Sequence, residues 1–112
     1  MREYIYLAAA IAAEVTGTTA LKFSDGFSAL VPTTVVLVAY IGSFYLLSLT
    51  LQELPIGLVY ATWSAVGIVG AAAIGLVLFD ETVDVAGVAG ILLIIAGVAV
   101  LNLMSETYSP AA

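Results

Sequence analysis

The carboxylate of Glu14 is the side chain in this sequence with the clearest capacity for chemistry. It lies within AAAIAAEVTGTTALK, residues 8–22, where its neighbours are apolar or small until Lys22. An acid at the centre of a helix in hydrocarbon costs about 2.5–3.5 kcal/mol, and the other long apolar runs contain no Lys, Arg or His to neutralise it. We therefore expect Glu14 to exchange a proton for a cation that comes from outside. A protonated structural acid bonded to a neighbouring helix is the alternative.

The helical face around Glu14 leaves space beside the carboxyl group. Residues three or four positions away on a helix are neighbours, and here they are Ala10, Ile11, Gly17 and Thr18. Three of these side chains are small, which suits a binding cavity. Small residues also let two helices pack closely, so this face alone does not distinguish a cavity from a helix contact.

Two aromatic stripes accompany the acid at helical spacing. Ring faces attract cations most strongly when water is excluded, so an aromatic wall around a carboxylate would suit a lipophilic cation. Ordinary packing of these rings against neighbouring helices is an equally good explanation. Tyr4 and Tyr6 stand near the start of their run, where an anchoring role at the membrane surface is expected. The stripes consist of Tyr40, Ser43, Phe44 and Leu47 in one run, and of Tyr60, Trp63, Ser64 and Gly67 in the next.

The elements that must position these residues are membrane helices. The chain has 112 residues, of which 63% are hydrophobic and 9% charged, whereas a soluble domain carries about 25% charged residues. Four apolar runs, at about 4–21, 32–51, 56–79 and 85–104, each reach the length of about 20 residues that crosses a bilayer. The short connections make neighbouring helices antiparallel. We expect a turn at Gly26 in the first connection and a helix N-cap at Asp84 in the third. We predict an all-α membrane protein in which residues 1–112 form a single four-helix transmembrane domain.

The composition also excludes several classes of function. The sequence contains no Cys and no His, which removes disulfides, thiolate or imidazole metal sites and the usual nucleophile–histidine pairs. The net charge of −6 does not suit nucleic acid or anionic lipid as a partner. We expect no enzyme activity, no cofactor and no metal.

Charge and small residues bear on orientation and assembly. Arg2 and Lys22 fall on opposite sides of the membrane and give no bias under the positive-inside rule; the simplest prediction is that copies insert both ways up, although two bases are few to judge from. Four short helices cannot easily enclose a substrate path, so we expect a dimer. We place its contact on the fourth helix, where close packing is favoured by small residues at Ala86, Gly90 and Gly97, with Ile94 between the glycines.

Four motifs together resemble the small multidrug resistance family, and its quaternary-ammonium branch in particular. They are A-E-V-x-G-T-T-x-x-K-F-S-x-G-F around Glu14, Y-x-x-S-F around Tyr40, G-x-x-Y-A-x-W-S around Trp63, and G-x-x-L-I-x-A-G-V-x-x-L-N around Gly97. The likeness covers nearly the whole chain. Ala65 stands where the family often has Gly, and Tyr45 where it often has Trp.

The resemblance implies export of hydrophobic organic cations across the cytoplasmic membrane, coupled to protons, by alternating access in an antiparallel, dual-topology homodimer. Glu14 matches the acid that binds proton and drug in mutually exclusive fashion. Gly67 matches part of a kink in the third helix, and Gly90 and Gly97 match the dimer seam. The positions that match the family's binding chamber are Tyr4, Thr18, Tyr40, Ser43, Tyr60, Trp63 and Ser64.

An acid within a membrane helix also occurs in proteins with other functions. Exporters of guanidinium or polyamines share the same fold; G-T-T after Glu14, together with Tyr40, favours aromatic drugs. A rotor-ring subunit of an ATP synthase also carries an acid in the membrane, but usually in the second helix of a hairpin. A structural membrane subunit without transport is the remaining alternative.

Overall fold

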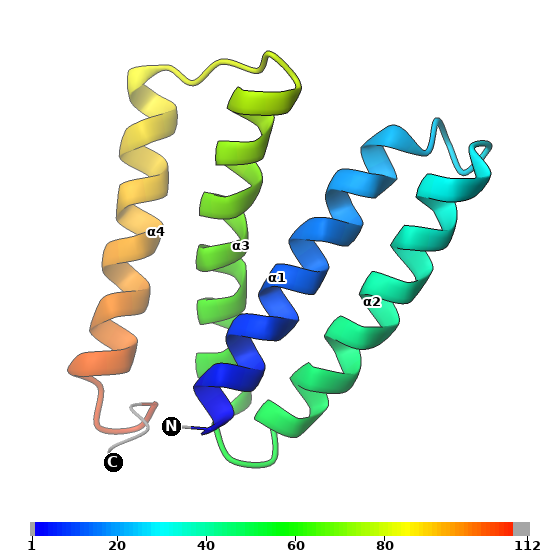
Figure 1. The fold of residues 1–112 in the computed structure, drawn as a ribbon. Helices are drawn as coiled ribbons and strands as arrows, with labels where there is room; N and C mark the ends of the chain where they lie inside the picture. The colour runs from blue at the N-terminus through cyan, green and yellow to red at the C-terminus, as the bar shows by residue number, and fades with distance from the viewer. Residues whose placement is uncertain (1, 109–112) are drawn as a thin grey trace. The chain divides into compact units, whose positions relative to one another are not determined.

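The structure is a computed structural model that describes residues 2–108 and folds this part of the chain into four α-helices (Figure 1). Each is long and apolar enough to cross a membrane. The all-α class with four candidate spans, predicted from the sequence, is therefore confirmed, and the helices begin and end within two residues of the predicted positions. The helices are α1 (Arg2–Phe23), α2 (Leu30–Thr50), α3 (Ile56–Leu78) and α4 (Val85–Leu103).

The contacts within the chain divide it into two compact units, Met1–Glu53 and Leu54–Ala112. The first is the hairpin of α1 and α2, and the second is the hairpin of α3 and α4. In each hairpin the two helices run antiparallel (Figure 1), as the short connections require. The prediction of one four-helix domain remains a prediction, and each unit is described by itself.

Small residues bring α1 close to α2. Ala10, Gly17 and Ala20 are buried on α1, and Ser43 is buried on α2. The Ser43 hydroxyl donates a hydrogen bond of 2.7 Å to the Ala10 carbonyl. Without bulky side chains at these positions the helix backbones can approach within reach of such a bond.

The connection between α1 and α2 turns through left-handed backbone conformations. Gly26 has φ +67°, a value that glycine adopts at no steric cost, which confirms the turn predicted there. Ser24 is fully buried, and its hydroxyl donates to the Leu21 carbonyl at 2.7 Å and accepts from the Phe27 N–H at 3.1 Å. The Leu21 carbonyl also accepts the Ser24 backbone N–H at 3.1 Å, so Ser24 joins the last turn of α1 to the connecting loop.

Hydrogen bonds hold both ends of the connection between α3 and α4. The Gly75 carbonyl accepts the backbone N–H groups of Phe79 and Glu81 at 3.2 and 3.0 Å. Asp84 Oδ1 accepts from the Gly87 N–H at 2.8 Å, so the N-cap predicted at Asp84 is confirmed. A side-chain acceptor at this position satisfies a backbone donor of the first helical turn.

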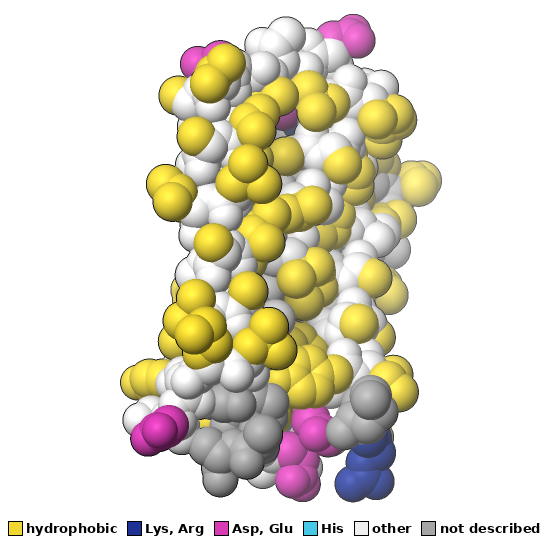
Figure 2. Space-filling view, turned by 90° about the vertical axis from the view of Figure 1, so that its left-hand side faces the viewer, with side chains coloured by type: hydrophobic (Ala, Val, Ile, Leu, Met, Phe, Trp, Pro, Cys, Tyr) yellow, Lys and Arg dark blue, Asp and Glu magenta, His cyan; other side chains and the backbone are white. Residues whose placement is uncertain are grey.

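The outer surfaces of the helices are apolar. Figure 2 shows hydrophobic side chains along the helices on the face in view, with acidic and basic side chains mainly toward the helix ends. No residue of α4 is buried, and Leu93 is 73% exposed. A surface of this kind is stable in hydrocarbon but not in water.

Candidate functional site

Glu14 lies half-buried in the middle of α1 and is held by a hydroxyl group from its own helix. Thr18, one turn further on, donates from Oγ1 to Glu14 Oε1 at 2.9 Å. The same Thr18 oxygen lies 2.7 Å from the phenol oxygen of Tyr40 on α2. Three side chains predicted from the sequence are thus joined in one hydrogen-bonded chain.

The ring of Tyr40 rests against Gly17. A Cβ atom at Gly17 would lie only 2.6 Å from Cδ1 and Cε1 of Tyr40, closer than two carbon atoms can pack. Only a residue without a side chain permits this approach. The close contact at Gly17 therefore places the Tyr40 phenol next to Thr18.

The other predicted residues of the first unit lie at different depths. Ala10 and Ile11 are buried, and Ala10 contributes its carbonyl to the bond with Ser43. Tyr4 is half-buried near the start of α1. Phe44, by contrast, is 59% exposed, so the stripe predicted on α2 contains both buried and exposed members.

The aromatic residues predicted on α3 are neighbours in the second unit. The rings of Tyr60 and Trp63 pack edge to face with their centroids 5.7 Å apart, a favoured geometry for aromatic pairs. Tyr60 is 66% exposed, whereas Trp63 and Ser64 are half-buried. Trp63 Nε1 is buried and has no hydrogen-bond acceptor among residues 2–108.

The predicted hinge and dimer residues lie on continuous helices. α3 runs through Gly67 without interruption from Ile56 to Leu78. On α4, a Cβ atom at Gly90 or Gly97 would meet nothing within 4 Å, and Ile94 is exposed. The roles of these four residues remain predictions.

The structure adds a polar contact that the motif analysis did not assign to any function. Asn102 Nδ2 on α4 donates to Thr62 Oγ1 on α3 at 3.1 Å and to the Val98 carbonyl at 3.0 Å. An amide within a membrane span commonly bonds to a neighbouring helix. The presence of Asn102 in an otherwise apolar run was the signal that could have predicted this contact.

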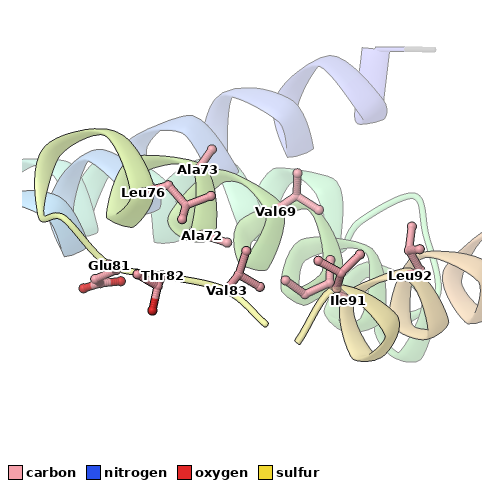
Figure 3. A pocket seen from close by; sticks show the side chains of 10 residues that line it. Val69, Ala72, Ala73, Leu76, Glu81, Thr82, Val83, Ile91 and Leu92 are labelled. Atoms are coloured by element: carbon pink, nitrogen blue, oxygen red, sulfur yellow. The ribbon is translucent and has the colours of Figure 1, made fainter. Parts of the chain in front are cut away.

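A separate cavity of about 370 Å³ opens between α3 and α4 next to their connecting loop (Figure 3). Aliphatic side chains of both helices line it, including Val69, Leu76 and Ile91, and Glu81 and Thr82 lie at its loop end. None of the residues predicted to bind substrate lines this cavity. The candidate site is therefore built on Glu14, where the hydrogen-bonded side chains converge.

The arrangement around Glu14 can accept either a proton or a positive charge. A carboxylate accepts hydrogen bonds when ionised and donates one when protonated, while a hydroxyl can do both. Thr18 and Tyr40 can therefore adapt to either state of the acid by rotating their O–H groups. This property is what a site that exchanges protons for cations requires.

The chain belongs to the small multidrug resistance family, because residues 2–94 match the family described as "Small Multidrug Resistance protein". It is thus a multi-pass membrane transporter and not an enzyme, as predicted.

Relatives match the chain over almost its full length. The multidrug transporter EmrE of Escherichia coli (strain K12) is 45% identical over 107 residues, which cover 96% of this chain and 97% of the relative. The quaternary ammonium compound-resistance protein QacE of Escherichia coli is 44% identical over 106 residues, or 95% of this chain and 96% of QacE. The multidrug resistance protein EbrA of Bacillus atrophaeus is 50% identical over 99 residues, or 88% of this chain and 94% of EbrA.

Proposed function

We propose that this protein exports hydrophobic and quaternary ammonium cations across the cytoplasmic membrane in exchange for protons. The names of its relatives support this substrate class, because QacE is a quaternary ammonium compound-resistance protein and EmrE a multidrug transporter. Aromatic side chains at Tyr40, Tyr60 and Trp63 are suited to such cations, since ring faces attract positive charge in the absence of water.

The observation that carries the proposal is the intramembrane carboxylate of Glu14 with its hydroxyl partners. Thr18 donates to Glu14 Oε1, and the helices contain no basic side chain at membrane depth. Protonation and cation binding each neutralise the same carboxylate. The two events are therefore mutually exclusive, and that exclusion couples the inward flow of protons to the outward flow of the cation.

The working unit in this proposal is an antiparallel homodimer of oppositely inserted copies. Its support is the balance of Arg2 and Lys22 across the membrane and the unburied surface of α4 around Gly90, Ile94 and Gly97. The buried Trp63 N–H would cost about 1–3 kcal/mol if left unsatisfied, and a second copy can supply its acceptor. Two identical copies in opposite orientation make the two access states equal in energy, so the proton gradient alone sets the direction of transport.

Alternating access then follows from an exchange of conformation between the two copies. Protons from outside neutralise the two Glu14 carboxyl groups. When the chamber opens inward, a cation displaces the protons, and the exchange of conformations presents that cation to the outside. Gly67 on α3 is the residue proposed to bend during this exchange.

The decisive experiment is transport in vesicles by the Glu14→Gln variant. Glutamine keeps the size of the side chain but does not ionise, so it can neither release a proton nor carry charge. We expect uptake of tetrabutylammonium driven by a pH gradient to fall to background. Uptake that persists in this variant would refute the proposal.

Two controls sharpen the result. Glu14→Asp retains the carboxylate on a shorter side chain, and we expect it to bind cations with a shifted pH optimum. Binding of guanidinium is measured beside that of tetrabutylammonium, since stronger binding of guanidinium would assign the protein to a guanidinium-exporting branch instead.

A further inference from the structure

Thr18 uses its hydroxyl group differently from other threonines in the helices. Its oxygen bonds to two side chains, Glu14 and Tyr40, although its own backbone acceptor four residues earlier would be within ordinary reach. In five other threonines the hydroxyl donates to the backbone carbonyl four residues earlier, while the Thr62 hydroxyl on α3 accepts a hydrogen bond from Asn102. The five are Thr16, Thr19, Thr33, Thr34 and Thr50, with donor–acceptor distances of 2.7, 2.8, 2.6, 2.9 and 3.0 Å.

The two bonds of Thr18 form a chain with a defined direction. A threonine hydroxyl has one hydrogen to donate, and in this arrangement Thr18 donates it to Glu14 Oε1. The contact of 2.7 Å with Tyr40 must then be donated by the phenol. If Glu14 is protonated, the chain can reverse: the acid donates to Thr18, and Thr18 donates to Tyr40.

We propose that Thr18 and Tyr40 form a proton relay that loads and unloads Glu14. On release, the proton of Glu14 passes to the Thr18 oxygen while the hydrogen of Thr18 passes to the Tyr40 oxygen. The hydrogen of Tyr40 passes in turn to a water molecule at the open side of the chamber. The products are ionised Glu14, two neutral hydroxyl groups and a hydronium ion, so the atoms and charges balance.

The packing of Tyr40 against Gly17 fixes the positions of the two hydroxyl groups of the relay. The Tyr40 ring lies against Gly17, and Gly17 is adjacent to Thr18 on α1, so the phenol is held where its oxygen meets the hydroxyl. Tyr40 also belongs to the aromatic wall proposed to contact the cation. A cation against that ring would cover the outer end of the relay and hinder the proton's return, which would limit leakage.

This inference rests on the proposed function, and its test is the rate of proton release from vesicle-reconstituted protein when tetrabutylammonium is added. Thr18→Val keeps the shape of the side chain but removes the hydroxyl. We expect release to slow about tenfold, less than the full contribution of about 10²–10⁴ from a positioned proton-transfer group because water can partly replace the hydroxyl. Thr18→Ser should restore the rate to within about twofold of wild type.

Thr19→Val is the matched control. The Thr19 hydroxyl is on the same turn of α1 but donates to the backbone, to the Val15 carbonyl at 2.8 Å. We expect its release rate to equal that of wild type. Equal rates for Thr18→Val and Thr19→Val, or failure of Thr18→Ser to restore release, would overturn the relay.

A second variant keeps the test open if Thr18→Val does not fold. Tyr40→Phe preserves the ring against Gly17 and removes only the phenol oxygen. We expect proton release by Tyr40→Phe alone to slow about tenfold, as for Thr18→Val, and release at the wild-type rate would contradict the relay. Where both single variants fold, the double variant should be no slower than the slower single variant because both hydroxyls belong to one chain, whereas independent roles would multiply the two effects. Multiplied effects would contradict the proposal.

The two proposals fail in distinguishable ways. Transport by Glu14→Gln would remove the proposed function and the relay together. Transport that needs Glu14 and a pH gradient, with normal proton release in both Thr18→Val and Tyr40→Phe, would remove the relay alone.

Discussion

At the scale of single residues, the geometry of the site depends on Gly17, because a glycine has no side chain. Gly17 is a neighbour of Glu14 on the helical face, but its structural effect is on Tyr40, whose ring occupies the space that a Cβ atom would take. The phenol reaches Thr18 because of this close approach. Gly17, which has no side chain, thus helps to set the geometry around the carboxyl group of Glu14.

Gly17→Ala tests this point. Alanine improves helix propensity by about 1 kcal/mol relative to glycine, but the clash with Tyr40 should cost about 1–3 kcal/mol and move the phenol away from Thr18. We expect loss of pH-driven uptake and no net gain in the free energy of unfolding, measured with denaturant in micelles.

Gly42→Ala on α2 is the control, because a Cβ atom there meets nothing within 4 Å. It should gain the helix propensity without the clash, so the two variants should differ in unfolding free energy by about 1–3 kcal/mol. Equal stabilities and equal transport would show that the Tyr40 ring is free to move aside.

At the scale of elements, each hairpin combines apolar surface with a few directed polar contacts. Ser43 bonds to the backbone of α1 in the first unit, and Asn102 bonds to Thr62 in the second. Such bonds are worth about 0.6–2 kcal/mol in membrane helices. They fix the rotation of one helix against the other, which packing of uniform aliphatic surfaces does not.

The N-terminus of α4 offers a test of whether the Asp84 side chain stabilises the first helical turn. Asp84→Ala removes the side-chain acceptor of the Gly87 N–H, with an expected cost of about 1 kcal/mol, which corresponds to about fivefold faster hydrogen exchange at Gly87. Asp84→Asn also removes the charge but retains an acceptor. We expect its exchange rate to stay near that of wild type, and an asparagine variant as fast as the alanine variant would mean that charge, not capping, holds this end.

At the scale of the whole molecule, the exposed surface of α4 argues for a second copy. None of its residues is buried, and Gly90 and Gly97 leave open space at their Cα atoms. A Cβ atom at either position meets nothing within 4 Å among residues 2–108 of the chain, so a loss of self-association on substitution there would indicate contact with a second copy.

Gly97→Leu uses this property to test the dimer. We expect self-association in detergent to weaken about tenfold or more, because overpacking a helix contact costs about 1–3 kcal/mol, while the helical content stays unchanged. Mass measurement in micelles gives the oligomeric state. Ala99→Leu is the control, since Ala99 is exposed and lies about 200° around the helix from Gly97. Wild-type association of Gly97→Leu would place the dimer contact elsewhere.

Local patterns were sufficient to predict the elements of this protein. Long apolar runs broken by short polar stretches indicated four membrane helices, and the cap at Asp84 and the turn at Gly26 followed from residue type alone. The reason is that hydrocarbon leaves the backbone few choices other than a helix. The chemical role proposed for Glu14 also comes from its position, because the cost of an acid at that depth depends on the sequence around it, and this role remains a prediction.

The partners of the acid were decided by tertiary structure. The stripe containing Tyr40 was recognised, but that its phenol meets Thr18, 22 positions earlier, depends on the rotation and register of α2 against α1. The face with Ala10, Gly17 and Thr18 was compatible with either a cavity or a helix contact, and the structure contains a contact at Ala10 and Gly17 and a hydrogen-bonded acid at Glu14. Small residues allow two helices to approach but do not specify their register. That choice is made only when the side chains of both helices pack together.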